Sequence, residues 1–106
     1  MSKVSFFYIT VPDEKTGEQI ASELLNKKLI ACANILPAHK SLYVWKEELC
    51  NQKEHILILK TQTNLQATVE KEVSQLHPYE CPCILTFSPT HGNTEFISWI
   101  ESQTSN

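Results

Sequence analysis

The pattern of apolar and polar residues predicts a β-hairpin over residues 41–61. The first arm ends in Tyr43-Val44-Trp45, a charged turn follows, and the second arm ends in the apolar run 56–59. A strand with one face in water should alternate apolar and polar residues. The second arm is therefore expected to be covered on both sides or to lie in the centre of a sheet.

The predicted hairpin is long for a chain of 106 residues. A strand-like segment from Ala31 allows arms of about 13–15 residues, which span about 45–50 Å at about 3.3 Å per residue. A compact domain of this length is only about 33 Å across. Because bare strand edges invite pairing, we expect other copies of the chain to cover the overhanging arms.

The remaining pattern predicts a first strand and two long helices. Residues 4–11 form the strand, and Asp13 caps a helix over residues 14–28. Thr63 begins a capping box that opens the second helix. That helix ends at His77, because a residue before proline is disfavoured in helical geometry.

A strand over residues 83–87 and a short C-terminal helix complete the chain. The turn between them contains His91, Gly92 and Asn93, which are interpreted as structural: Gly92 supplies a positive φ and Asn93 caps the helix. The element order predicts an α+β fold of the ferredoxin-like β-α-β-β-α-β type with an added C-terminal helix. It forms a single domain, 1–106, with the two long helices on one face of an antiparallel sheet.

The amino-acid composition disfavours two classes of protein, namely nucleic-acid readers and phosphate-clamping enzymes. The chain has 42% hydrophobic residues and a net charge of −3, and all nine basic residues other than histidine are lysines. Nucleic-acid readers and phosphate-clamping enzymes usually rely on arginine, so we expect no nucleic-acid partner. No apolar run reaches the roughly 18 residues of a membrane span, and four cysteines fit the reducing cytoplasm.

His77 is the candidate metal ligand, because a neutral imidazole beside a strand can bind a transition metal. The alternative is a histidine that caps carbonyl groups at the helix end. Cys81 and Cys83 follow closely, and thiolates prefer soft metals such as copper(I). The two side chains would point to opposite faces of an extended strand, and Cys83 also fits a small buried position.

Trp45 and Glu54 flank the hairpin turn, and Glu54 could face a cleft between subunits together with Lys60. The alternative is that Glu54 is a solvated charge that faces the neighbouring strand. The sequence contains no catalytic motif of the P-loop, zinc-protease or dinucleotide-binding type.

Several ordered motifs resemble the CutA divalent-cation tolerance family, and the resemblance runs from about residue 4 to residue 100. The motifs that carry it are Val11-Pro12-Asp13, residues 29–35 with Pro37, residues 41–43 with Trp45, Glu54, residues 58–61, His77-Pro78-Tyr79 with Pro82, residues 90–93, and Trp99-Ile100.

The resemblance implies a ferredoxin-like subunit, a stable homotrimer whose long hairpins pack against neighbours, and a link to divalent-metal tolerance, with copper bound in some members. It implies no established catalytic activity. The trimer is also similar to PII signalling proteins, which bind small effectors between subunits. That similarity suggests a cleft formed by the following candidates: Trp45, Glu54, Lys60, Tyr79 and Cys83.

The sequence departs from the family pattern at three places. The bacterial copper site uses a cysteine and two successive histidines, whereas this chain has Ile9, Leu76 and His77 there, so only His77 remains. Glu47 replaces the usual glycine of the hairpin turn, so the turn must differ in type or be strained. Cys83 replaces a carboxylate near Tyr79.

Two hypotheses from different classes follow. The first is a non-enzymatic, trimeric cytoplasmic protein linked to tolerance of divalent metals, with copper as the expected ion. The second is a PII-like sensor or scaffold that binds a small ligand in clefts between subunits. A third reading, an acylphosphatase-type enzyme on the same fold, is disfavoured because such sites use an arginine to bind phosphate.

Overall fold

The structure, a computed structural model, describes residues 3–105. Its elements follow in the order β1 (Val4–Val11), α1 (Glu14–Asn26), β2 (Cys32–Ile35), β3 (His39–Trp45), β4 (Glu48–Gln62), the 3-10 helix η1 (Thr63–Leu65), α2 (Gln66–Leu76), β5 (Ile84–Phe87) and α3 (Thr94–Gln103). The predicted order is confirmed, with the first hairpin arm divided into β2 and β3 around Pro37. None of the helices within residues 3–105 is long and apolar enough to cross a membrane.

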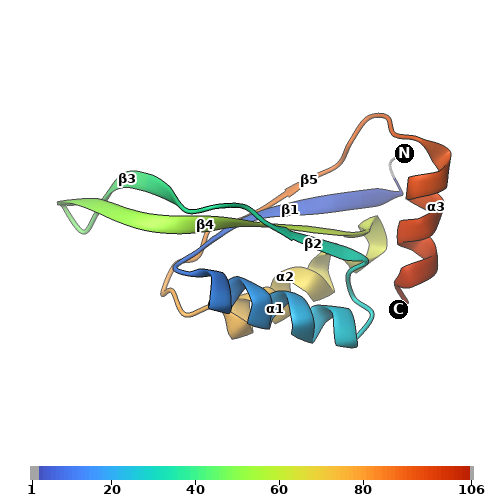
Figure 1. Cartoon of the computed structure of the whole chain (residues 1–106), viewed down its shortest axis with the longest axis horizontal. Helices are drawn as coiled ribbons and strands as arrows, with labels where there is room; N and C mark the ends of the chain where they lie inside the picture. The colour runs from blue at the N-terminus through green and yellow to red at the C-terminus, as the bar shows by residue number, and fades with distance from the viewer. Residues whose placement is uncertain (1–2, 106) are drawn as a thin grey trace.

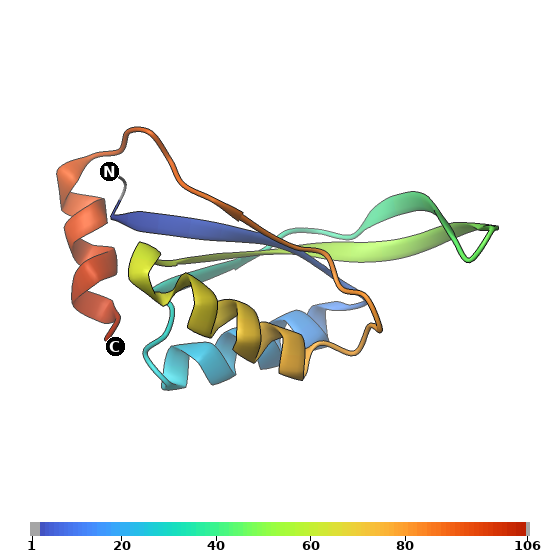
Figure 2. The same cartoon turned by 180° about the vertical axis from the view of Figure 1, so that it is seen from behind.

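The sheet is antiparallel and has the strand order β2-β4-β1-β5, with β3 paired to the outer part of β4. The inner part of β4, from His55 onward, pairs with β1 on one side, and residues 57–60 pair with β2 on the other. Helices α1 and α2 lie together on one face of this sheet (Figures 1 and 2). The ferredoxin-like fold is therefore as predicted.

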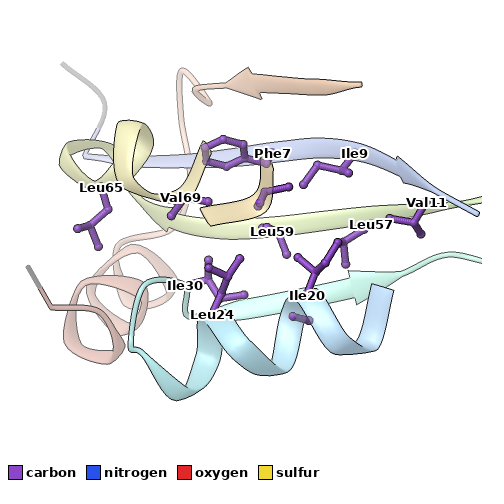
Figure 3. Packing of buried hydrophobic residues seen from close by; sticks show 12 residues of the cluster. Phe7, Ile9, Val11, Ile20, Leu24, Ile30, Leu57, Leu59, Leu65 and Val69 are labelled. Carbon is purple, nitrogen blue, oxygen red and sulfur yellow. The ribbon is translucent and has the colours of Figure 1, made fainter. Parts of the chain in front are cut away.

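The hydrophobic core lies between the sheet and these two helices (Figure 3). Alternate residues of the strands point into it, including Phe7 and Ile9 of β1 and Leu59 of β4, all of them fully buried. They meet Leu24 of α1 and Val69 of α2, also fully buried. The two-residue period of the strands and the helical period of α1 and α2 thus converge on one layer.

The opposite face of the sheet is only partly covered. Tyr8 faces Leu85 and Phe6 faces Phe87 across the β1–β5 pair, and the Phe6 and Phe87 rings stack with centroids 5.6 Å apart. Leu85 is 54% exposed. We call this surface, formed by Phe6, Tyr8, Ile58, Leu85 and Phe87, the open sheet face.

Helix α3 covers only one end of the sheet (Figure 2). Its Ile100 packs in a small cluster with Val4 and Ala31. Its Phe96 ring lies under the ammonium group of Lys60, which is 5.5 Å from the ring centroid. The rest of the open sheet face therefore has no cover from α3.

The β3–β4 hairpin projects beyond the helices (Figure 1). The subunit measures 44 × 27 × 23 Å, so its long dimension exceeds the roughly 33 Å of a compact domain of this length. Leu42, Val44 and Leu49 on this projection are 65%, 68% and 77% exposed. The predicted overhang is present in the single subunit.

The two predicted helix caps have different outcomes. Asp13 caps α1 as predicted, because its Oδ1 accepts a hydrogen bond of 2.8 Å from the backbone N–H of Thr16. The capping box at Thr63 is wrong: Thr63 lies in η1, and its hydroxyl lies 2.9 Å from the Ser5 hydroxyl. Helix α2 begins only at Gln66 and has no side-chain cap bond.

The predicted turn before α3 is present, but its backbone differs from the prediction. No glycine within residues 3–105 has a positive φ, so the role predicted for Gly92 is wrong. A Cβ atom at this position would lie 3.3 Å from Cδ1 of Ile97, so close packing favours glycine there. Asn93 occupies the N-cap position without a side-chain cap bond, and His91 is exposed beside it.

The hairpin turn is strained, in agreement with the sequence. Lys46 and Glu47, between the paired residues Trp45 and Glu48, have φ of 51° and 67°. Two positive φ angles are what a two-residue type I′ turn needs, and glycine or asparagine normally supplies them. This chain has Lys46 and Glu47 at these positions, and a residue with a Cβ atom is strained at a positive φ.

We expect Glu47→Gly to stabilise the protein by about 0.5–1 kcal/mol, because relief of left-handed strain exceeds the entropy that glycine loses on folding. The denaturant midpoint measures this gain. Glu47→Ala removes the same charge but keeps a Cβ atom, so it should give no gain. Equal denaturant midpoints for Glu47→Gly and Glu47→Ala would contradict the proposal that the positive φ of Glu47 is strained.

Candidate functional site

The candidate site is a pocket of about 410 Å³ between one face of the β3–β4 hairpin and the loop that follows α2. It is lined by Thr10, Tyr43, Trp45, Cys50, Gln52, Glu54, Tyr79, Glu80, Cys81 and Cys83. Four of the five residues predicted for a cleft, namely Trp45, Glu54, Tyr79 and Cys83, therefore line one pocket of a single subunit.

Strand periodicity places the hairpin side chains in this pocket. Cys50, Gln52 and Glu54 are alternate residues of β4, so they share one face. Tyr43 pairs with Cys50 across the hairpin, and its hydroxyl donates a hydrogen bond of 2.6 Å to Oε1 of Gln52. The spacing of these alternate residues, counted back from Glu54, was a signal in the sequence that could have identified Cys50 and Gln52.

Glu54 and Tyr79 form the polar centre of the pocket. Glu54 is only 5% exposed, and its Oε2 accepts a hydrogen bond of 2.6 Å from the Tyr79 hydroxyl. Burial, followed by this bond and the charge of Glu54, raises the pKa of Tyr79 well above its usual value. The phenol therefore stays protonated and acts as a donor to the carboxylate.

His77 packs against Tyr79 and is buried. Its Nε2 lies 2.8 Å from the backbone oxygen of Thr10, to which it donates, and its Nδ1 accepts the backbone N–H of Tyr79 at 3.2 Å. The His77 and Tyr79 rings are 4.7 Å apart. Both imidazole nitrogens are thus occupied, and this pattern fixes the neutral tautomer with the proton on Nε2.

A metal ion at His77 would require a ring nitrogen to give up one of these hydrogen bonds. Within residues 3–105 no three histidine, cysteine, aspartate or glutamate side chains are grouped so that they could hold a metal ion. A copper site at His77 would therefore need ligands beyond those that the described residues of one subunit group together, and His77 as a ligand stays a prediction.

Three of the four cysteines, Cys50, Cys81 and Cys83, line the pocket, and all are free thiols. Burial and the charge of Glu54 raise the pKa of the Cys83 thiol. Metals and electrophiles react with the thiolate, so this position is poorly prepared for either. The carboxylate expected at this position by resemblance is replaced by a neutral group.

Lys60, the remaining cleft candidate, lies elsewhere. It belongs to the inner part of β4, where it is opposite Phe6 and Cys32, and its ammonium lies over Phe96. It does not line the pocket that Glu54 helps to form. Six residues of extended strand separate its side chain from that of Glu54 in the same subunit by about 20 Å. The predicted cleft between subunits, with Lys60 in it, stays a prediction.

The pocket has a negative charge balance. Glu54 and Glu80 both line it, and none of the ten lining residues is a lysine or a histidine. At the rim, the Lys46 ammonium lies 3.7 Å from Oε1 of Glu80 and 5.9 Å from the centroid of the Trp45 ring. The arrangement suits a positively charged group better than an anion.

Comparison with solved structures agrees with this architecture. The crystal structure of the divalent ion tolerance protein CutA1 from Ehrlichia chaffeensis aligns with a TM-score of 0.94 and 39% identity, covering 100% of this chain and 99% of that one. The divalent cation tolerance protein CutA1 of Thermus thermophilus aligns with a TM-score of 0.91 and 34% identity, covering 96% and 99%.

Sequence comparison gives the same result. The divalent-cation tolerance protein CutA of Citrobacter koseri is 39% identical over 93 residues, which are 88% of this chain and 81% of the relative. An Escherichia coli relative of the same name is 38% identical over 88% of this chain and 83% of its own length. The family model of the CutA1 divalent ion tolerance proteins matches residues 5–103. The chain therefore belongs to the CutA1 divalent ion tolerance protein family.

Proposed function

We propose that the chain is a non-enzymatic, cytoplasmic homotrimer that contributes to tolerance of divalent metals, with copper as the ion concerned. The observation that carries this proposal is the family match over residues 5–103. The relatives are named for tolerance of divalent cations. The four free thiols fit a reducing compartment.

Two surfaces support self-association. The open sheet face presents Leu85 and Phe87 with exposed fractions of 54% and 47%, and the hairpin exposes Leu42, Val44 and Leu49. Contiguous apolar surface of this kind marks sites of association in soluble proteins. Packing of hairpins and sheet faces between copies would remove both from water.

The pocket supports a role without catalysis. A nucleophile is activated by a lowered pKa or by a neighbouring base. Here the pKa values of both Tyr79 and Cys83 are raised, so both groups keep their protons, and the Tyr79 hydroxyl donates a hydrogen bond to the Glu54 carboxylate. These groups are suited to holding a ligand rather than to attacking it.

The test for copper is a titration of the assembled protein with Cu²⁺ and Zn²⁺. If His77 is a ligand, His77→Gln, which can keep the bond to Thr10, should weaken copper binding at least tenfold, or by about 1.4 kcal/mol. His91→Gln, at an exposed histidine, is the control and should bind as the wild type does. Unchanged affinity in His77→Gln would remove His77 as a ligand.

Growth measures the function itself. Expression of the chain in a bacterium that lacks its own CutA protein should raise the copper concentration that the cells tolerate. The empty vector is the control for the burden of expression. Equal tolerance with and without the chain would contradict the proposed role.

A second candidate function is the binding of a small organic ligand, as in a sensor or scaffold. The specific observation in its favour is the pocket beside Glu54, whose volume of about 410 Å³ falls within the range of about 300–1,000 Å³ for small-molecule sites. Its aromatic walls and few polar groups are also typical of such sites.

A further inference from the structure

We propose that the pocket between the β3–β4 hairpin and the loop after α2 binds a small organic cation that carries an ammonium group. This inference rests on the second candidate function, ligand binding in the pocket, and names the chemical class of that ligand. It does not depend on the role in metal tolerance.

The first support is the buried charge of Glu54. This carboxylate is 5% exposed, and no ion pair joins it to a basic side chain within residues 3–105. Its partner is a neutral phenol, Tyr79, on Oε2, which leaves Oε1 as an acceptor for a ligand. A buried carboxylate is costly unless a cation or several donors compensate it, so a bound cation would complete the site.

The second support is the aromatic wall. Tyr43, Trp45 and Tyr79 line the same pocket as Glu54 and Glu80. Aromatic rings attract cations through the negative charge of their faces, and sites for quaternary ammonium groups are commonly built from such rings. Rings and carboxylates together favour an organic ammonium over a neutral ligand of the same shape.

A lysine at the edge of the pocket already contacts both an aromatic ring and a carboxylate. Lys46 places its ammonium 5.9 Å from the Trp45 centroid and 3.7 Å from Oε1 of Glu80. The lysine side chain is 70% exposed, so water weakens both interactions there. A ligand ammonium deeper in the pocket would meet the same kinds of partner with less competition from water.

The other ligand classes fit less well. An anion would face two carboxylates, Glu54 and Glu80, without a lysine in the lining. A metal ion would find no group of three suitable ligands within residues 3–105, and the raised pKa of Cys83 disfavours the thiolate that soft metals need. An organic cation is the class that uses both the charge and the rings.

The test is calorimetric titration of the assembled full-length chain with choline and with 1,4-diaminobutane. The matched control ligand is 3,3-dimethyl-1-butanol, which has the shape of choline without its charge. We expect at least one cation to bind at least tenfold more tightly than the alcohol, with an affinity that falls as salt is added. No cation binding at millimolar concentration, or equal binding of the alcohol, would overturn the inference.

A pair of variants tests the residue that carries the charge. Glu54→Gln keeps the size of the side chain and an acceptor for Tyr79, and should lower cation affinity at least tenfold. Glu48→Gln, an exposed change on the same strand and outside the pocket, should leave it unchanged. Equal affinity in the two variants would contradict the role of Glu54.

Folding of Glu54→Gln is checked by its melting temperature and assembly mass; if it does not fold, the comparison of choline with the alcohol on the wild type still decides. Failure of the inference and failure of the proposed function are separable. Loss of cation binding with intact copper tolerance would refute only the pocket ligand. Cation binding without copper tolerance would refute only the metal function.

Discussion

Leu24→Ala should lower the free energy of unfolding by about 2–5 kcal/mol, the range for a leucine removed from a well-packed core. Leu24 is fully buried on α1 and packs with Phe7 and Leu59 in the layer between helix and sheet. Its removal leaves a cavity that the surrounding strands cannot fill. The midpoint of guanidinium unfolding, followed by circular dichroism at fixed protein concentration, measures the loss.

The neighbouring residue offers a matched control. Leu25→Ala makes the same chemical change one position along the helix, where the side chain is 43% exposed. It should cost less than about 1 kcal/mol, because less apolar area leaves the protein interior. Similar losses for both leucines would mean that the buried layer is not where the structure places it.

Leu85→Asp should convert the homotrimer that we propose into single chains. Leu85 lies on the open sheet face opposite Tyr8, and we propose that this face is buried between copies. An unpaired carboxylate in an apolar interface costs several kcal/mol, and a closed trimer would bear this cost at each subunit contact. Sedimentation velocity at micromolar concentration measures the change.

The control for added charge is Ser22→Asp, on the exposed surface of α1. It introduces the same carboxylate away from the open sheet face and should leave the sedimentation coefficient unchanged. Circular dichroism of Leu85→Asp should keep the wild-type helix and strand content, because the side chain is already 54% exposed in one subunit. A variant of Leu85 that sediments like the wild type would exclude this face from the interface.

Periodicity predicted the fold because the strong patterns lie in elements that form the core. The strand predicted over residues 4–11 and the apolar run ending at Leu59 correspond to β1 and β4, and both strands pack against the two predicted helices. The capping box at Thr63 failed because tertiary contacts competed with it. The Thr63 hydroxyl meets Ser5 of β1, and the helix starts later.

The site was predicted only in part. Trp45, Glu54 and Tyr79 were identified from their motifs, and the pocket unites them. Lys60, which was predicted for a cleft between subunits, does not line this pocket of one subunit. The engagement of both His77 nitrogens could not be predicted, because its partner carbonyl belongs to Thr10, on a strand distant in sequence.

The central claim is that the overhanging hairpin and the open sheet face are buried between copies of the chain. The molar mass in solution tests it most directly, by light scattering of the wild-type protein over a range of micromolar concentrations. We predict a constant mass equal to three chains of 12.1 kDa each. A constant mass of one chain, 12.1 kDa, would contradict it.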